Sequence, residues 1–184
     1  MGRLRYGVLC SLDGYTADAG GRFDWAAPDE EVHAFVNDLE RSVGTALYGR
    51  RMYETLAVWQ TVGGPGTDPV EDDYAEVWRA TDKIVYSTTL AGVSTPRTRL
   101  ERVFDPGAVR AMKAGSAADL AVGGPGLAAH ALAAGLVDDL HQLLSPVVVG
   151  GGTRALPDGL RLDLELVDER RFGNGVVHTY HRVR

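Results

Sequence analysis

The stretch near residue 120 constrains the fold most, because an apolar run there meets a glycine-rich turn and then a helical pattern. Residues 118–122 predict a strand, and Gly123 and Gly124 predict a tight turn with backbone conformations closed to other residues. Pro125 suits a first helical turn, whose N–H groups lack partners within the helix, and Gly135 falls where a C-terminal cap is expected. A strand, turn and helix in this order direct free N–H donors and the positive end of a helix dipole at one point. The stretch therefore predicts a phosphate site.

Glycine-rich turns also occur in connections that bind nothing, so composition has to narrow the alternatives. A chain of 184 residues with 45% hydrophobic content predicts one globular domain over residues 1–184. The formal net charge of -6, with 25 acidic and 19 basic side chains, argues against nucleic acid or an anionic membrane as a partner. The single cysteine, Cys10, excludes an intrachain disulfide, and no run approaches the ~18 apolar residues of a membrane span. We expect a soluble cytoplasmic protein with a small-molecule partner.

Strand and helix patterns alternate along most of the chain. A helix is predicted from Asp29, because Val32, Phe35, Val36, Leu39 and Val43 form one apolar stripe. The remaining predicted helices cover residues 51–59, 72–80, 106–113 and 125–134, and the strands cover 3–11, 45–48, 83–86, 100–104, 118–122 and 137–149. The tail from 160 to 183 predicts two strands joined at Gly173-Asn174-Gly175, a hairpin signal. The order predicts a three-layer α/β/α fold with a mixed, mainly parallel sheet and an antiparallel C-terminal hairpin.

In open α/β sheets ligands bind beyond the carboxyl ends of the strands, so the loops that follow strands are candidate sites. Arg50 and Arg51 suit bidentate binding of a phosphate, and Ser87 and Thr88 supply hydroxyls. A solvated helix start is the alternative for the arginines, although cations there oppose the helix dipole. The chain lacks the G-x-S-x-G, G-x-x-x-x-G-K-[ST] and H-E-x-x-H motifs, and its five histidines show no metal-ligand spacing. No metal is expected.

The order of several short motifs resembles the dihydrofolate reductase-like family. Within it, the chain is most similar to the reductase domain of the bifunctional riboflavin-pathway enzyme, the RibD C-terminal domain, and to stand-alone relatives of that domain. The matching segments are SLDGYTA at 11–17, DW at 24–25, GRRMYE at 49–54, VYS at 85–87, VGG at 122–124, GLVDDL at 135–140 and PVVVGGG at 146–152.

The resemblance implies NADPH as the cofactor. It places Gly49, Arg50 and Arg51 at the adenosine 2′-phosphate, with Ser87 and Thr88 beside them. It places Gly123, Gly124, Gly126 and Leu127 around the pyrophosphate, and Thr16 and Ala17 beside the nicotinamide. The family usually carries a threonine where this chain has Met52, so one phosphate-binding hydroxyl is missing.

On the substrate side, the resemblance implies a carboxylate one helical turn before a phenylalanine, a short way after a tryptophan. Trp25, Glu31 and Phe35 fit that order, which makes Glu31 the candidate catalytic residue and Asp29 the next. The alternative is that acidic residues at a helix start only satisfy the helix dipole. If Glu31 lies deep in a pocket, its pKa should be raised.

These observations predict an NADPH-dependent reductase that transfers a hydride to a C=N or C=O carbon of a pterin-like or pyrimidine-like heterocycle. The first alternative is the 5-amino-6-(5-phosphoribosylamino)uracil reductase of riboflavin biosynthesis, although the loop from 18 to 24 offers only Arg22 to hold a ribose phosphate. The second is a nucleotide-binding module without turnover. We also expect a homodimer, because an exposed apolar strand edge tends to be paired.

Overall fold

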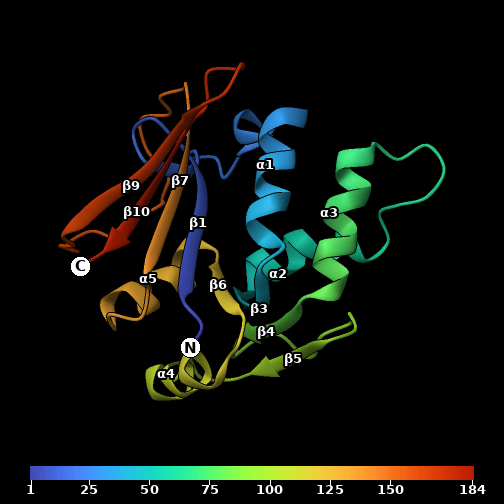
Figure 1. The fold of residues 1–184 in the computed structure, drawn as a ribbon, viewed down its shortest axis with the longest axis vertical. Coiled ribbons are helices and arrows are strands. Elements are labelled where there is room, and N and C mark those ends of the chain that lie inside the picture. The colour runs from blue at the N-terminus through green and yellow to red at the C-terminus, as the bar shows by residue number, and fades with distance from the viewer.

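The computed structural model describes all 184 residues and contains one mixed eight-stranded sheet in the order β5-β4-β3-β6-β1-β7-β10-β9 (Figure 1). Its strands are β1 (Leu4–Ser11), β3 (Val43–Gly49), β4 (Asp82–Tyr86), β5 (Thr98–Glu101), β6 (Asp119–Gly123), β7 (Asp139–Ser145), β9 (Leu164–Arg171) and β10 (Val177–Val183). All pairings from β5 to β7 are parallel, whereas β10 runs antiparallel to β7 and β9. The predicted fold class is confirmed, and the carboxyl ends of six strands share one edge.

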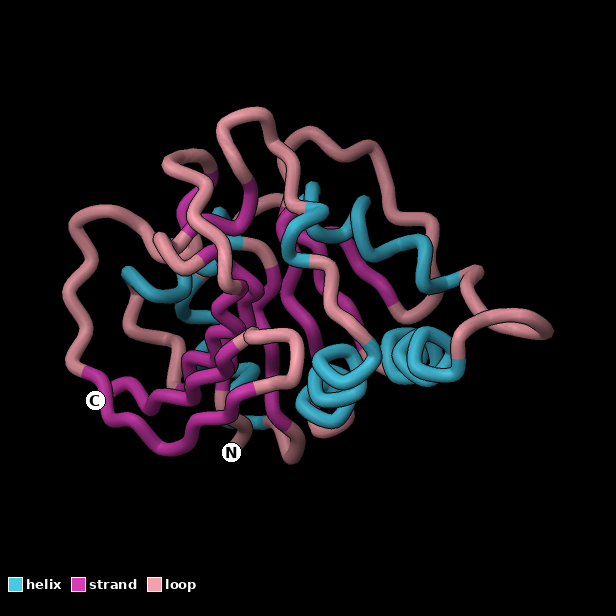
Figure 2. The backbone as a smooth tube through the Cα atoms, turned by 90° about the horizontal axis from the view of Figure 1, so that it is seen from above, coloured by secondary structure: helices cyan, strands magenta, loops and turns pink.

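Helices cover both faces of this sheet. They are α1 (Glu30–Glu40), α2 (Arg50–Leu56), α3 (Pro69–Ala80), α4 (Pro106–Gly115) and α5 (Pro125–Ala133), with short 3-10 helices η1 (Asp24–Ala26) and η2 (Ala57–Gln60). The helices α1 and α3 stand side by side and appear end-on from above, whereas α5 lies across the sheet from them (Figures 1 and 2). No helix is both long enough and apolar enough to cross a bilayer.

The structure corrects three expected elements. The strand predicted over 137–149 ends at Ser145, because Pro146 has no N–H to donate to a ladder. The stretch after β1, for which the sequence predicts no element, contains β2 (Tyr15–Ala17), which pairs with β8 (Thr153–Arg154), and η1. The strand expected at 100–104 lies at Thr98–Glu101.

Alternation along β1 explains how the two faces are filled. Leu4, Tyr6, Val8 and Cys10 are buried in the larger core, which α4 and α5 complete. Leu9 points to the other face, where it packs with a smaller cluster beneath α1. Because both faces are covered, the strand is a nearly continuous apolar run in the sequence. The single cysteine, Cys10, is buried in this core with a free thiol.

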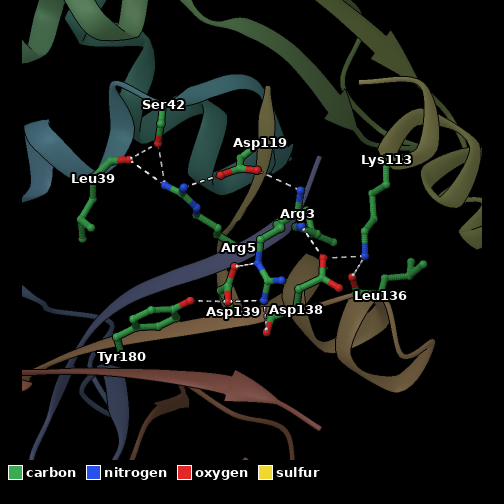
Figure 3. A network of polar contacts seen from close by, with 11 residues as sticks. Arg3, Arg5, Leu39, Ser42, Lys113, Asp119, Leu136, Asp138, Asp139 and Tyr180 are labelled. Carbon is green, nitrogen blue, oxygen red and sulfur yellow. Dashed lines mark hydrogen bonds and ion pairs between the residues drawn. The ribbon is translucent and has the colours of Figure 1, made fainter. Parts of the chain in front are cut away.

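Ion pairs close the edge of the sheet where the parallel strands begin (Figure 3). Arg3 donates to Asp139 at 2.5 and 2.6 Å, and Tyr180 of β10 donates to the same carboxylate at 2.8 Å. Arg5 pairs with Asp119 of β6, and Lys113 of α4 pairs with Asp138 at 2.7 Å. This network joins β1, β6, β7 and β10 at the edge opposite the carboxyl ends of the parallel strands.

A buried histidine pair lies between α1 and the sheet. Nδ1 of His141 lies 3.0 Å from Nε2 of His178, and Phe35 packs on the His178 ring at 4.7 Å between centroids. Burial lowers the pKa of His141 to about 4, with the neighbouring His178 adding to the effect, and burial also lowers the pKa of His178. At neutral pH the pair is therefore uncharged.

The histidine pair should make the stability of the protein depend on pH. Because the pKa of His141 is about 4 when folded and near 6.5 when unfolded, the unfolded state binds more protons between these values. The free energy of unfolding should therefore fall by on the order of 1–2 kcal/mol from pH 7 to pH 5, measured by urea unfolding. His141→Gln should flatten this dependence and His130→Gln, on α5, should not. An unchanged slope in His141→Gln would contradict the assignment.

Candidate functional site

The helix N-termini differ in how they are capped. Aspartates cap three helices: Asp29 accepts from Val32 N, Asp68 from Val70 N and Asp105 from Gly107 N. The helices α2 and α5 begin instead at Gly49 and Gly124, and no side chain caps either one. Their first N–H groups are therefore available to another acceptor.

These two uncapped N-termini adjoin one another. Gly123, at the end of β6, is the ladder partner of Tyr48, one residue before the end of β3. A Cβ placed on Gly49 would lie 3.8 Å from the Cβ of Leu127 in α5. The glycine turn and the arginine turn therefore lie side by side at one edge of the sheet, as the sequence predicts.

The glycines of these turns have two different explanations. A Cβ on Gly123 would lie 2.7 Å from the ring of Tyr48, and Gly124 has a φ of 89°, so the fold itself requires both. Around Gly126 a Cβ would meet nothing within 4 Å, and at Gly49 only an ordinary contact. Neither residue has a positive φ, so packing and backbone conformation do not explain these two glycines. Both leave the backbone open, which is what close approach of a ligand would need.

The two adjacent arginines differ in their side-chain contacts. Arg50 Nε donates to Glu54 at 2.8 Å and its Nη1 donates to Thr89 at 3.1 Å. Arg51 is exposed and makes no hydrogen bond or ion pair. A free guanidinium in the first turn of a helix opposes the helix dipole unless an anion joins it. Arg51 is thus a cation at these turns whose side chain has no partner in the protein.

The loop after β4 brings hydroxyl groups toward these arginines. Ser87 Oγ accepts from Leu90 N at 3.0 Å and from Thr89 N at 3.3 Å, so it shapes the turn. Thr88 is exposed and its hydroxyl makes no hydrogen bond. Through Thr89, this loop contacts Arg50 directly.

Thr16 and Ala17 lie in the short ribbon formed by β2 and β8. Thr16 Oγ1 donates to Thr153 O at 3.2 Å, and Ala17 is the ladder partner of Thr153. A Cβ on Gly152 would lie 2.0 Å from Ala17 O, so only glycine fits there. The loops that follow β1 and β7 therefore form one unit.

Asp13 holds the loops after β1 and β7 together through hydrogen bonds. Its carboxylate accepts from Gly150 N at 2.8 Å and from Val149 N at 3.2 Å. The Ser11 hydroxyl and these N–H groups hold its pKa below the usual range. Sequence reasoning did not assign a role to Asp13 or to this contact, because the contact joins segments more than 130 residues apart.

A cavity of about 170 Å³ opens beside this unit. Its walls come from the ends of β1 and β7, the start of α1 and the turn of the C-terminal hairpin, and they include Trp25. The lining is mostly apolar, with Ser145 and Asn174 as the polar side chains. An apolar cavity of about 150 Å³ holds benzene in another protein, so this one has room for a single aromatic ring.

Glu31 does not lie in this cavity. Its side chain is 46% exposed and accepts from Arg170 at 2.8 Å and from Gly173 N at 3.0 Å. The Gly173 N–H, followed by Arg170, lowers its pKa, so the expected deep position and raised pKa are wrong. Phe35 also lies outside the cavity lining and packs on Phe172 of the hairpin at 5.3 Å. Asp29, the second candidate, is the cap of α1.

A second hollow, of about 50 Å³, lies on the α1 side of the central strands and was missed from the sequence. Gly7 of β1 and Gly123 of β6 line it, together with Glu40, Tyr48 and Tyr74. One signal was present in the sequence, since a glycine inside a buried strand often marks a close approach to a ligand.

The sheet order, the C-terminal hairpin and the adjoining turns together define a dihydrofolate reductase-like α/β protein. A model of the RibD C-terminal domain matches residues 4–178, so the chain belongs to the RibD C-terminal domain family. It is 27% identical over 186 residues to the uncharacterized protein YyaP of Bacillus subtilis, covering 97% of this chain and 94% of YyaP.

Solved structures of other proteins share this fold. A putative riboflavin biosynthesis protein from Shewanella sp. PV-4 superposes with a TM-score of 0.76 at 19% identity, covering 100% of this chain and 99% of its own. A Thermotoga maritima diaminohydroxyphosphoribosylaminopyrimidine deaminase/5-amino-6-(5-phosphoribosylamino)uracil reductase gives 0.68 at 14% identity. This chain is matched over 100% of its length but spans only 57% of the Thermotoga protein. At these identities the superpositions show the fold alone.

Alanine substitutions should separate the two kinds of glycine. Gly123→Ala should cost about 1–3 kcal/mol of stability, because its methyl group meets the Tyr48 ring. Gly124→Ala should cost about 1–2 kcal/mol because of its positive φ. Gly126→Ala should stay within about 0.5 kcal/mol of the parent. Chemical denaturation measures all three, and a large loss in Gly126→Ala would contradict the ligand explanation for this glycine.

Proposed function

We propose that the protein is an NADPH-dependent reductase that transfers a hydride to a C=N or C=O carbon of a flat, pterin-like or pyrimidine-like heterocycle. The observation that carries the proposal is the pair of adjoining, uncapped helix N-termini at Gly49 and Gly124. Their amide donors suit the phosphates of a dinucleotide, and Gly126 leaves room for close approach. When bound, the reduced nicotinamide supplies the hydride.

The protein's own groups have separate tasks in this proposal. Arg50 and Arg51 hold the adenosine 2′-phosphate, with Ser87 and Thr88 beside it. Gly123, Gly124, Gly126 and Leu127 surround the pyrophosphate, and Thr16 and Ala17 flank the nicotinamide. The cavity lined by Trp25 lies over β1 and β7, and β6 lies between β1 and β3. Cofactor and substrate would thus meet over adjacent strands.

The riboflavin-pathway substrate remains the second candidate because of the Thermotoga reductase with this fold. That substrate carries a ribose phosphate, which needs a cation. Arg22, the only cation of the 18–24 loop, already pairs with Asp18, its Nε lying 3.0 Å from Oδ2. The geometry therefore favours a substrate without a phosphate. A binding module without turnover is the remaining alternative.

Two measurements separate these functions. NADPH is titrated while its fluorescence is followed, and then dihydrofolate or the ribosylaminopyrimidine is added while absorbance of the reduced nicotinamide is followed. Oxidation with a phosphate-free heterocycle supports the proposal, and oxidation only with the phosphorylated pyrimidine supports the second candidate. NADPH binding without oxidation by either compound would leave the binding module.

Arg51→Ala should weaken NADPH binding by about tenfold, the loss of a charge-assisted contact worth roughly 1.4 kcal/mol, and should leave NADH binding nearly unchanged. Fluorescence titration with both nucleotides measures the difference. Arg161→Ala is the matched control, because this exposed arginine pairs only with Asp163 outside the assigned site, and it should change neither affinity. Equal losses for NADPH and NADH in Arg51→Ala would refute the 2′-phosphate assignment.

We also retain the homodimer as a proposal. The last strand of the sheet, β9, leaves Leu164, Leu166 and Val167 exposed on an open edge. An unpaired apolar edge favours pairing with a second chain. Light scattering in dilute solution measures the oligomeric state.

A further inference from the structure

The cavity beside the C-terminal hairpin turn has no charged residue in its lining. Seven of its eleven lining residues are hydrophobic, and the other four are uncharged. Glu31 of α1 and Arg170 of β9 lie on the elements around it, but they pair with each other at 2.8 Å. An ion that leaves water for apolar surroundings loses hydration that nothing in this lining would replace. The cavity therefore suits an uncharged ligand.

Most polar groups in the walls of this cavity already have partners in the protein. In the hairpin turn, Gly173 N donates to Glu31 at 3.0 Å and Asn174 Oδ1 accepts from Val176 N at 3.0 Å. Asn174 is exposed, so water reaches its amide nitrogen. On the opposite side, Trp25 Nε1 donates to a carbonyl of the preceding loop at 3.2 Å. The walls are therefore held in place without a ligand, as in most small-molecule sites.

Ser145 is the exception among these groups. It is the last residue of β7, lines the cavity and is only 5% exposed, yet its hydroxyl makes no hydrogen bond. Its ladder partner in β1, Ser11, does use its hydroxyl, which accepts from Tyr15 N at 3.0 Å. Buried hydroxyl groups normally have a partner, and alanine would fill this position without an unpaired polar group. Packing therefore does not explain the hydroxyl of Ser145.

The position of Ser145 places this hydroxyl beside the proposed cofactor site. Ser145 and Ser11 end the adjacent strands β7 and β1, and Leu12 N donates to Val147 O at 2.8 Å just beyond them. The loops that follow these two strands carry the ribbon of Thr16 and Ala17. A ring held at Ser145 would thus lie next to the groups assigned to the nicotinamide.

We infer that Ser145 determines specificity in this cavity by donating a hydrogen bond to a ring nitrogen or carbonyl oxygen of an uncharged, single-ring nitrogen heterocycle. This inference rests on the proposed reductase function and narrows its substrate class. A volume of about 170 Å³ seats one ring, so any further ring or substituent projects out of the cavity. A ring without an acceptor atom leaves the hydroxyl unpaired and is bound less well.

A pair of rings of equal size tests the role of the hydroxyl. Pyrimidine has acceptor atoms and benzene has none, and ¹⁵N NMR titration measures the binding of both. Pyrimidine should shift the amide signals of Ser145 and Val176 in the parent chain. Ser145→Ala should bind pyrimidine about fivefold more weakly, through loss of one hydrogen bond, and should bind benzene within about twofold of the parent chain.

Ser116→Ala is the control, because the Ser116 hydroxyl donates to Ala118 O in the turn before β6, and it should change neither affinity. Unchanged pyrimidine binding by Ser145→Ala, equal losses for both rings, or no pyrimidine binding by the parent chain would overturn the inference.

Two measurements separate this role from a structural one. Ser145→Thr keeps the hydroxyl and should bind pyrimidine within about threefold of the parent chain. The Tm of Ser145→Ala should stay within about 2 °C of the parent value, because the hydroxyl has no partner in the protein to lose. A larger fall in Tm, or loss of pyrimidine binding in Ser145→Thr, would contradict the assignment.

The uncharged lining is tested with pyrimidine-4-carboxylate, which differs from pyrimidine by one carboxylate. At neutral pH it should bind at least about tenfold more weakly than pyrimidine, and equal or tighter binding would contradict the proposed substrate class. If pyrimidine binds through Ser145 but no heterocycle oxidises NADPH, the proposed reductase fails while the subsite stands. If NADPH is oxidised with the same kcat/KM by Ser145→Ala and the parent chain, the subsite fails alone.

Discussion

Parallel pairing of β3, β6, β1 and β7 is the constraint on which the rest of the structure depends. It places the turns after all four strands at one edge, so segments as distant as Gly49, Gly124 and Gly150 face the same space. Parallel strands also need crossovers on the faces of the sheet, which explains why helices begin at that edge. A single topological choice therefore gathers the amide donors, the free guanidinium of Arg51 and the apolar cavity.

The two ends of the parallel strands differ in whether their polar groups have partners in the protein. At the edge where the parallel strands begin, ion pairs and Tyr180 join four strands, and each carboxylate there has a partner (Figure 3). At the other edge, two helices lack caps and Arg51 lacks an anion. Unpartnered donors are costly unless water or a ligand satisfies them. The groups of the ion-pair network therefore stabilise the fold, whereas the helix amides and Arg51 at the other end have no partner in the protein.

Local chemistry made much of this predictable from the sequence. Asp105 precedes a proline, a pattern typical of a helix start, and caps α4. Gly135 follows α5 with a positive φ of 62°, as the predicted C-terminal cap requires. The convergence of the turns followed from the alternation of strands and helices. Glu31 was misplaced because its partners, Arg170 and Gly173, come from a hairpin about 140 residues away. Helical phase puts Glu31 at the edge of the apolar stripe, but only tertiary packing decides which cavity that edge faces.

Residues that lower the stability of the fold are more informative about function than residues that raise it. Asp29 and Gly124 stabilise a helix start and a turn, so their presence needs no ligand. Gly7 weakens a central strand, and Glu40 holds a partly exposed carboxyl beside Tyr48 and Tyr74 without a hydrogen bond. Both lower stability, and both line the same hollow. A glycine that weakens a central strand and a carboxyl without a partner in the protein are features that packing alone does not explain.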